Sequence, residues 1–274
     1  MKSPAKLNLS LEVLGKRPDG YHEIRSLMIP IDRFDDITIR LEGEGIECVC
    51  DHPDAPGGPK NLAYRAAEAF MRATGERFGV RISIEKHIPV GAGLGGGSGN
   101  AATVLKELNR LKGEPLCLQE MLDLAAGIGS DVPFFLKEGA QWAEGRGERL
   151  RDGPDLPFWT YLVVFPGFEI SAEWAYNNMP LTFEEKVNRI YYFKSERIRL
   201  VNHLEAAVLA VYPEVGKLKD CLLAVGAWAA LMTGSGPSVF GVFDNRAVAT
   251  EASRSFGDHP KAMVFLAQEL KHTP

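Results

Sequence analysis

The chain has 274 residues, which is enough for one large domain or two packed ones with a substantial core. Hydrophobic residues make up 45% of it and charged residues 24%, so the composition is globular and excludes disordered and fibrous classes. The formal net charge of −5 argues against a general nucleic-acid-binding protein, which normally presents a basic face.

Membrane and secreted classes are also disfavoured. The longest apolar runs, such as residues 161–165, are far too short to cross a bilayer, so we expect no membrane partner. The first apolar segment, residues 7–14, leaves no room for a signal peptide after Met1, and we expect a cytoplasmic protein. The cysteines suit a reducing compartment; they are Cys48, Cys50, Cys117 and Cys221. A metal site at Cys48 and Cys50 would need a second Cys or His pair to complete it, so we favour packing and assign no metal ligand.

Periodicity predicts strands and helices in both halves of the chain. The predicted strands are residues 3–9, 37–41, 80–84, 162–165, 229–233 and 239–243, and the predicted helices are 61–71, 101–111 and 118–128, with two or three more before Val225. The order follows no regular βαβ count, which favours the α+β class over a doubly wound sheet. A polar segment rich in Gly and Pro, residues 145–157, is the candidate boundary between domains at 1–153 and 154–274.

The segment richest in glycine, residues 89–100 (PVGAGLGGGSGN), joins a predicted strand to a predicted helix. Glycine permits positive φ and lets anionic oxygens approach backbone N–H groups, while the helix that follows adds free N–H groups and a positive dipole end. A flexible surface turn is the alternative. A P-loop would need Lys and then Ser or Thr after the last glycine, and both are missing. A dinucleotide-binding turn matches only at Gly91, Gly93 and Gly96. We therefore predict a phosphate site of another type.

Three further segments indicate a functional role less clearly than the glycine-rich segment does when each is considered alone. In the strand at residues 3–9, Lys6 and Asn8 share one face, and an edge-strand charge explains Lys6 better than a buried functional amine. Asp131, in the segment GSDVPF, is most simply a turn or helix-capping residue. The second glycine turn, residues 232–240 (MTGSGPSVF), is explained by a tight hairpin.

Together, these segments resemble the GHMP kinase superfamily, which has an N-terminal motif, a central glycine-rich loop and a C-terminal glycine turn. Residues 3–9, 18–23 (PDGYHE), 93–102 (GLGGGSGNAA) and 129–135 (GSDVPFF) are most similar to members that phosphorylate a cytidine-diphospho sugar alcohol. The Tyr-His pair in the second of these is the most discriminating part. The resemblance extends from Ser3 to about Phe243. It implies a two-domain GHMP kinase fold, with a ribosomal-protein-S5-domain-2-like N-terminal domain and a ferredoxin-like C-terminal domain.

The resemblance implies transfer of the terminal phosphoryl group of ATP to the 2-hydroxyl of that sugar alcohol. Asp131 takes the place of the catalytic carboxylate and Lys6 that of its partner. This assignment is chemically consistent, because phosphoryl transfer depends mainly on positioning and charge neutralisation. A carboxylate can accept the hydroxyl proton, and a nearby ammonium keeps that carboxylate ionised.

The resemblance also implies two binding regions. ATP would contact Asn61, Lys86, Pro89, Val90, Gly91, Ala92, Gly93, Leu94, Gly95, Gly96, Gly97, Ser98, Gly99 and Asn100, and Mg²⁺ is expected to accompany it without an assigned protein ligand. Without the resemblance, Asn61 and Lys86 would be interpreted as ordinary surface residues. The substrate would contact Asn8, Tyr21, His22, Tyr176, Thr233, Gly234 and Ser235, with Tyr21 and His22 at the cytosine and Tyr176 closing its other side. Trp174 competes with Tyr176 for that role.

Two positions depart from the family pattern. Gly99 replaces a serine of the loop, so any phosphate or Mg²⁺ contact from that hydroxyl is lost. Ala172 replaces a threonine of the substrate pocket, and Ser171 faces the opposite way if the segment is extended. The alternatives are another small-molecule kinase of the superfamily, a nucleotide-binding regulator without catalysis, and a nucleic-acid-binding domain, which the acidic charge opposes. The sequence does not specify an oligomeric state.

Overall fold

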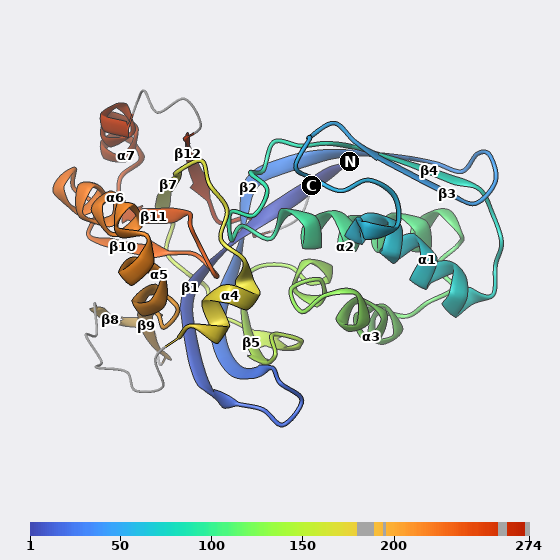
Figure 1. Cartoon of the computed structure of the whole chain (residues 1–274), viewed down its shortest axis with the longest axis horizontal. Coiled ribbons are helices and arrows are strands. Elements are labelled where there is room, and N and C mark those ends of the chain that lie inside the picture. Colours follow the sequence, from blue (N-terminus) through green and yellow to red (C-terminus); the bar gives the residue numbers. More distant parts are fainter. Residues whose placement is uncertain (180–188, 194–195, 257–261, 272–274) are drawn as a thin grey trace.

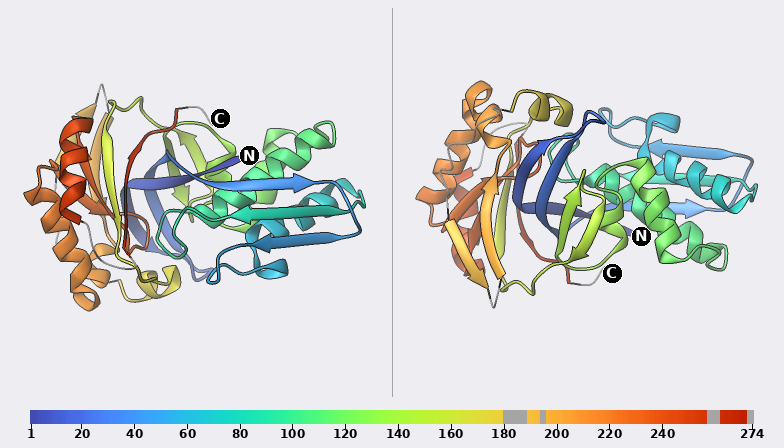
Figure 2. Two further views of the ribbon diagram at one scale, coloured as in Figure 1. Left: turned by 90° about the horizontal axis from the view of Figure 1, so that it is seen from above. Right: turned by 90° about the horizontal axis from the view of Figure 1, so that it is seen from below.

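The computed structural model describes residues 1–179, 189–193, 196–256 and 262–271, which are arranged around two sheets (Figures 1 and 2). The larger sheet has eight strands in the order β3-β4-β2-β1-β9-β8, with β5 paired to β2 and β6 to β5. These strands are β1 (Lys2–Lys16), β2 (His22–Arg40), β3 (Ile46–Cys50), β4 (Val80–Glu85), β5 (Gln141–Gly145), β6 (Arg149–Asp152), β8 (Arg189–Phe193) and β9 (Glu196–Asn202).

The smaller sheet is built from the second half of the chain and has four strands in the order β10-β11-β7-β12. Its strands are β7 (Thr160–Phe165), β10 (Ala229–Met232), β11 (Val239–Phe243) and β12 (Met263–Gln268). The helices are α1 (Leu62–Thr74), α2 (Gly96–Leu111), α3 (Leu118–Ile128), α4 (Ala172–Asn177), α5 (Glu205–Val211), α6 (Pro213–Ala224) and α7 (Arg246–Ser253). The expected α+β class is confirmed, and no helix in the described ranges is long and apolar enough to span a membrane.

The first three helices pack together against the larger sheet, at one end of the molecule (Figure 1). The Asn61 side chain caps α1 by accepting a hydrogen bond from the backbone N–H of Ala63 at 2.9 Å. The helix α3 occupies the predicted residues. The helix α2 begins at Gly96, earlier than the apolar spacing predicted, because the last glycines of the loop form its first turn.

Strand β1 separates two environments. Its residues Ala5, Leu7 and Leu9 are buried in the apolar core between the two sheets. Successive strand residues point to opposite faces, so Lys6 and Asn8 face away from that core. The helices α5, α6 and α7 cover the other side of the smaller sheet, where a third apolar core lies.

The structure also contains strands that the sequence did not predict. Strands β8 and β9 lie in a stretch where only helices were expected, and β12 near the C-terminus was missed. Strand β9 pairs in parallel with β1 through Ser10–Val201 and Leu11–Asn202, so the second half of the chain completes the larger sheet. The polar segment predicted as a boundary contains the turn between β5 and β6 and then β6 itself.

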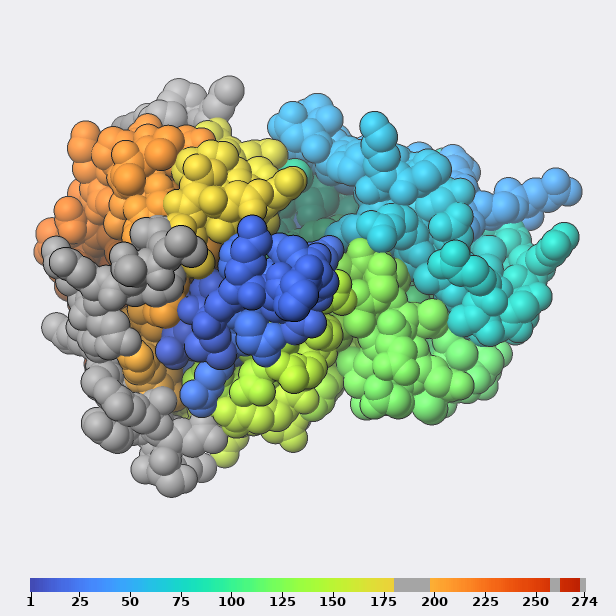
Figure 3. Space-filling view, turned by 60° about the horizontal axis from the view of Figure 1, so that its bottom comes forward, coloured from blue at the N-terminus to red at the C-terminus, as the bar shows by residue number. Residues whose placement is uncertain are grey.

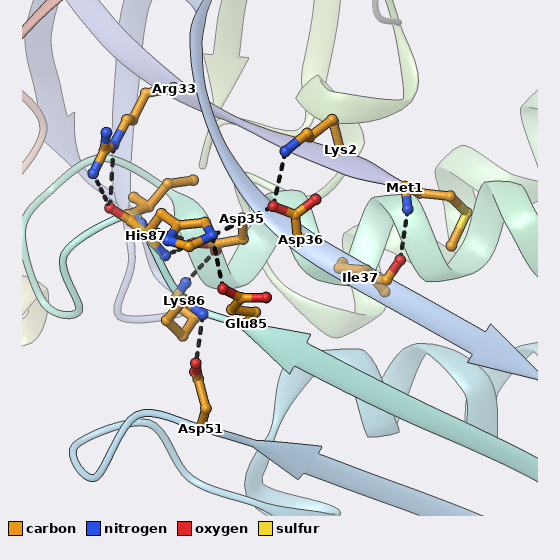
Figure 4. A network of polar contacts seen from close by, with 11 residues as sticks. Met1, Lys2, Arg33, Asp35, Asp36, Ile37, Asp51, Glu85, Lys86 and His87 are labelled. Carbon is orange, nitrogen blue, oxygen red and sulfur yellow. Dashed lines mark hydrogen bonds and ion pairs between the residues drawn. The ribbon is translucent and has the colours of Figure 1, made fainter.

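A buried ion pair fixes the chain between β4 and the glycine-rich loop (Figure 4). Asp35 is fully buried and accepts hydrogen bonds from the backbone N–H groups of His87 and Ile88, each at 2.8 Å. The Lys86 ammonium pairs with the same carboxylate, and 5% of its side chain is exposed. The interpretation of Lys86 as a surface residue is therefore wrong: its charge is buried and sets the path of the chain into the loop.

We predict that Asp35→Asn lowers the free energy of unfolding by about 3–5 kcal/mol, because it leaves the Lys86 ammonium buried without a counter-charge. The neighbouring Asp36→Asn is the control. Asp36 is 36% exposed in its side chain and pairs with Lys2 at 2.8 Å, so its loss costs less than about 1 kcal/mol. Urea denaturation measures both values. Equal stabilities of the two variants would contradict the assignment.

Candidate active site

Three segments that are distant in sequence attach to one edge of β1. The backbone N–H of Lys6 donates to the carbonyl oxygen of Leu94 in the glycine-rich loop at 2.9 Å. Two residues on, the N–H of Asn8 donates to the hydroxyl of Thr233 in the C-terminal glycine turn at 3.0 Å. Strand β9 pairs from Ser10 onward. This edge of β1 therefore brings the two glycine segments together.

The amine of Lys6 lies beside the carboxylate of Asp131, with 3.6 Å between Nζ and Oδ2. Lys6 is 3% exposed, so the edge-charge interpretation is wrong and the amine is buried. It also donates to the side-chain carbonyl oxygen of Asn8. Burial lowers the pKa of Lys6, and the charge and hydrogen-bonding of Asp131 oppose that shift. Asp131 lies in the turn after α3, and 36% of its side chain is exposed.

The glycine-rich loop lies next to this pair. Gly93 and Gly95 have φ of 77° and 70°, in the left-handed region, and Gly95 is the N-cap of α2. A Cβ at Gly95 would lie 2.9 Å from Cγ of Lys6, and one at Gly93 would overlap the carbonyl oxygen of Thr233. The absence of side chains at these two glycines is therefore what lets the loop pack against β1 and the C-terminal turn.

A cavity of about 680 Å³ joins these groups. Its walls include Lys6 and Asp131, the loop residues Gly93, Gly95 and Ser98, and the turn residues Gly234 and Ser235. Figure 3 shows a hollow beside the blue tip of the β1–β2 hairpin and the yellow helix α4, two of the elements that border the cavity. The sequence-predicted catalytic pair, loop and turn thus meet in one place.

The other end of the cavity is aromatic. The rings of His22 and Tyr176 stack with centroids 5.3 Å apart at 22°, and the ring of Tyr21 is about half exposed. Burial and the charge of Lys16 lower the pKa of His22, which favours its neutral form. Burial and the negative charge of Asp131 raise the pKa of Tyr176. Trp174 packs edge-on against Tyr212 instead and does not line this cavity, whereas Tyr176 lines it in direct ring contact with His22.

Some predicted site residues do not line this cavity. The Asn61 side chain is engaged by its own helix and by the carbonyl oxygen of Pro56, and the Lys86 amine is held by Asp35. Thr233 is fully buried behind the turn. The loop residues outside the lining are Pro89, Val90, Gly91, Ala92, Leu94, Gly96, Gly97, Gly99 and Asn100, of which Pro89, Ala92, Leu94 and Asn100 have buried side chains.

The two departures from the family pattern have different consequences. A Cβ at Gly99 would lie 2.6 Å from the carbonyl oxygen of Pro4, so α2 packs against β1 more closely than a serine there would allow. Ala172 lines the cavity as the first residue of α4, and Ser171 does not, because its hydroxyl caps this helix by accepting from the N–H of Trp174 at 3.4 Å. Ser171 therefore does not replace the missing threonine.

The sequence interpretation missed three charged residues of the wall, Asp19, Arg146 and Glu173. Asp19 belongs to the quoted PDGYHE segment, which could have identified it. Arg146 lies in the predicted boundary segment, where no motif distinguishes it from the other arginines. Only the folded arrangement places it at the cavity.

Mg²⁺ prefers oxygen ligands and is usually held by one or two carboxylates together with substrate phosphates and water. Within the described ranges, no group of three or more His, Cys, Asp or Glu residues could hold a metal ion. The lining includes the Ser98 hydroxyl and the Asp131 carboxylate, oxygen donors that fit an ion held mainly by phosphates.

We predict that Gly93→Ala weakens the affinity for ATP, the nucleotide expected at this loop, roughly tenfold or more. The left-handed φ costs a side chain about 1–2 kcal/mol, and the added methyl also overlaps Thr233. Calorimetric titration of ATP measures the effect. Gly127→Ala in α3 is the control, because its Cβ meets no atom within 4 Å. Equal ATP affinities in the two variants would show that the packing of Gly93 against the C-terminal turn does not affect ATP binding.

The chain matches two family models along its length. The model of the GHMP kinases N terminal domain matches residues 61–139, and that of the GHMP kinases C terminal domain matches residues 190–262. Together they cover more than half of the chain.

The chain is also similar to named proteins over nearly its whole length. A 4-diphosphocytidyl-2-C-methyl-D-erythritol kinase of Syntrophotalea carbinolica is 43% identical over 98% of both chains. One of Geobacter sp. strain M21 is 43% identical over 92% of this chain and 91% of its own. The crystal structure of a 4-(cytidine 5'-diphospho)-2C-methyl-D-erythritol kinase is 34% identical, covers 98% of both chains and superposes with a TM-score of 0.80. The chain therefore belongs to the GHMP kinases, in the family of the 4-diphosphocytidyl-2-C-methyl-D-erythritol kinases.

Proposed function

We propose that this chain transfers the γ-phosphoryl group of ATP to the 2-hydroxyl of 4-diphosphocytidyl-2-C-methyl-D-erythritol, giving the 2-phosphate and ADP in non-mevalonate isoprenoid precursor synthesis. One observation carries the proposal: the Lys6 amine lies 3.6 Å from the Asp131 carboxylate, in the same cavity as the glycine-rich loop. An alcohol placed at that carboxylate would face phosphates held by the loop. The intact pair also disfavours a regulator without catalysis.

The loop would hold the triphosphate through backbone N–H groups. The first turn of α2, from Gly96 to Ser98, has N–H groups without intrahelical partners, and the helix dipole adds positive charge there. Bound Mg²⁺ would neutralise phosphate charge, and Ser98 and Asp131 are two lining residues whose oxygens could contact it. The contacts of the loop with β1 and the C-terminal turn hold its N–H groups in place before ATP arrives, which lowers the cost of binding.

Asp131 would accept the proton of the 2-hydroxyl as its oxygen attacks the γ-phosphorus and the bond to the β,γ-bridging oxygen breaks. The Lys6 ammonium would stabilise negative charge on the attacking oxygen. Asn8 orients Lys6, because its side-chain oxygen accepts from the amine while its N–H₂ group donates to the Ser26 hydroxyl at 2.8 Å. The buried amine is therefore held in one position.

The aromatic end of the cavity would bind the cytosine. His22 and Tyr176 are in direct ring contact at 5.3 Å, so a base would stack beside this pair rather than between its rings. Gly234 and Ser235, at the wall near Lys6, would contact the substrate at its alcohol end. The division into domains at 1–153 and 154–274 and a cytoplasmic location are likewise proposals.

The substrate assignment predicts that the purified protein phosphorylates 4-diphosphocytidyl-2-C-methyl-D-erythritol with ATP, and that mevalonate and homoserine are turned over far more slowly. The reason is that neither competitor carries a base for Tyr21, His22 and Tyr176. A coupled ADP-release assay measures the three rates. Faster turnover of either competitor would contradict the substrate assignment but would still agree with a kinase reaction.

Asp131→Asn is expected to lower kcat by about 10²- to 10⁴-fold, because the amide cannot accept the hydroxyl proton. The affinity for ATP should change little, since the loop is untouched. Asp123→Asn is the control: it makes the same change on α3, where Asp123 accepts a hydrogen bond from the side chain of Gln119 at 3.0 Å and does not line the cavity. Steady-state kinetics and ATP titration test both variants. If Asp131→Asn turned over substrate at the wild-type rate, Asp131 would be excluded as the general base.

A further inference from the structure

Arg146 faces the cavity from the turn between β5 and β6. Its guanidinium carbon lies 4.7 Å from the centroid of the Tyr21 ring, a cation–π stack at the cavity wall. Within the described part of the chain, Lys6 and Arg146 are the only lysine and arginine residues of this wall. Lys6 is committed to Asp131 and Asn8. Arg146 is thus the second fixed positive charge of the site, and the mechanism above gives it no role.

The acidic groups around Arg146 accept their hydrogen bonds from other donors, although Asp19 lies close enough to interact with the charge of Arg146. Asp19 accepts hydrogen bonds from the Arg17 side chain at 3.1 Å and from the backbone N–H of Tyr21 at 3.1 Å. Glu148 accepts from the backbone N–H of Arg146 itself at 2.6 Å. In the described ranges, no carboxylate forms an ion pair with the Arg146 guanidinium. Its donors are therefore free for an anionic ligand in the cavity.

The position of Arg146 lies between the two ends of the cavity. On one side, its guanidinium rests on Tyr21 at the aromatic end. On the other side, the next residue is Gly147, whose added Cβ would lie 3.8 Å from the Asp131 carboxylate oxygen. The turn therefore spans from the aromatic end to the catalytic carboxylate. A ligand reaching from one end to the other along this turn would lie beside Arg146.

The proposed substrate has the matching order of groups: a base, a diphosphate and then the alcohol. We propose that Arg146 binds the diphosphate of the cytidine substrate and so fixes the distance between the stacked base and the reacting hydroxyl. This inference rests on the proposed function. A guanidinium suits the task, because its planar donors bind phosphate oxygens in pairs and its charge persists at all physiological pH values. The stack on Tyr21 orients it before the ligand arrives.

The test compares cytidine, CMP and CDP as ligands of the wild type, Arg146→Gln and Arg146→Lys by calorimetric titration. Glutamine keeps a planar group that can rest on Tyr21 but removes the charge. We expect Arg146→Gln to lower the affinity for CDP about 10- to 100-fold, the loss of a charged hydrogen bond, and to leave cytidine unchanged. Arg146→Lys should recover part of the CDP affinity. The KM for ATP should not move.

Arg151→Gln is the matched control. Arg151 lies on the same hairpin and also stacks on a ring, 5.1 Å from the centroid of Trp142, but it does not line the cavity. An equal loss for cytidine and CDP in Arg146→Gln would overturn the proposal, since Arg146 would then only support Tyr21. A raised KM for ATP in Arg146→Gln would also overturn it, because the guanidinium would then bind ATP. Unchanged CDP affinity in Arg146→Gln would overturn it as well.

Failure of the proposed function can be recognised separately. It would appear as wild-type protein that binds nucleotides but does not phosphorylate 4-diphosphocytidyl-2-C-methyl-D-erythritol. The comparison of CDP with cytidine needs no turnover, so it decides the role of Arg146 in either case. Wild-type protein that binds CDP no more tightly than cytidine would refute a diphosphate site here.

Discussion

One edge of β1 is the constraint on which the rest of the structure depends. Over the short stretch from Lys6 to Leu11, its backbone receives the glycine-rich loop, then the C-terminal glycine turn and then β9. Buried N–H groups need partners, and these three segments supply them. The same stretch turns the Lys6 amine toward Asp131. Satisfying the hydrogen bonds of one strand therefore also assembles the phosphate cradle beside the catalytic pair.

This arrangement explains why the site tolerates a buried charge. An isolated ammonium would be costly to bury, but Lys6 has the Asp131 carboxylate and the Asn8 side-chain oxygen as partners. The C-terminal turn is fixed in a similar way. Asn202 donates to the carbonyl oxygens of Met232 and Gly234, each at 2.8 Å, and buried Glu205 accepts from the N–H of Met232 at 2.7 Å. Buried hydrogen bonds thus fix the cavity walls on both sides, as expected of a site that works by positioning its ligands.

Sequence patterns predicted the parts of this protein that depend on local spacing. The helix α3, the glycine loop, and the strands β7, β10 and β11 lie close to where periodicity placed them. The pattern could not reveal that Lys6 is buried, because burial depends on segments nearly a hundred residues or more away. Strands β8 and β9 were missed for the same reason, since β9 pairs with a strand near the N-terminus. The roles predicted for Asp131 and Tyr176 came from the resemblance to the GHMP kinases. No sequence motif marked Arg146 as a residue of the site.

In the proposed mechanism, the N-terminus of α2 directs the γ-phosphate of ATP at a hydroxyl held beside Lys6 and Asp131. A crystal structure of the ternary complex with a non-hydrolysable ATP analogue and 4-diphosphocytidyl-2-C-methyl-D-erythritol tests it most directly. We expect the substrate 2-hydroxyl within hydrogen-bond distance of Asp131 and about 3–3.5 Å from the γ-phosphorus, in line for attack. A triphosphate bound away from the loop, or a hydroxyl out of reach of Asp131, would contradict it.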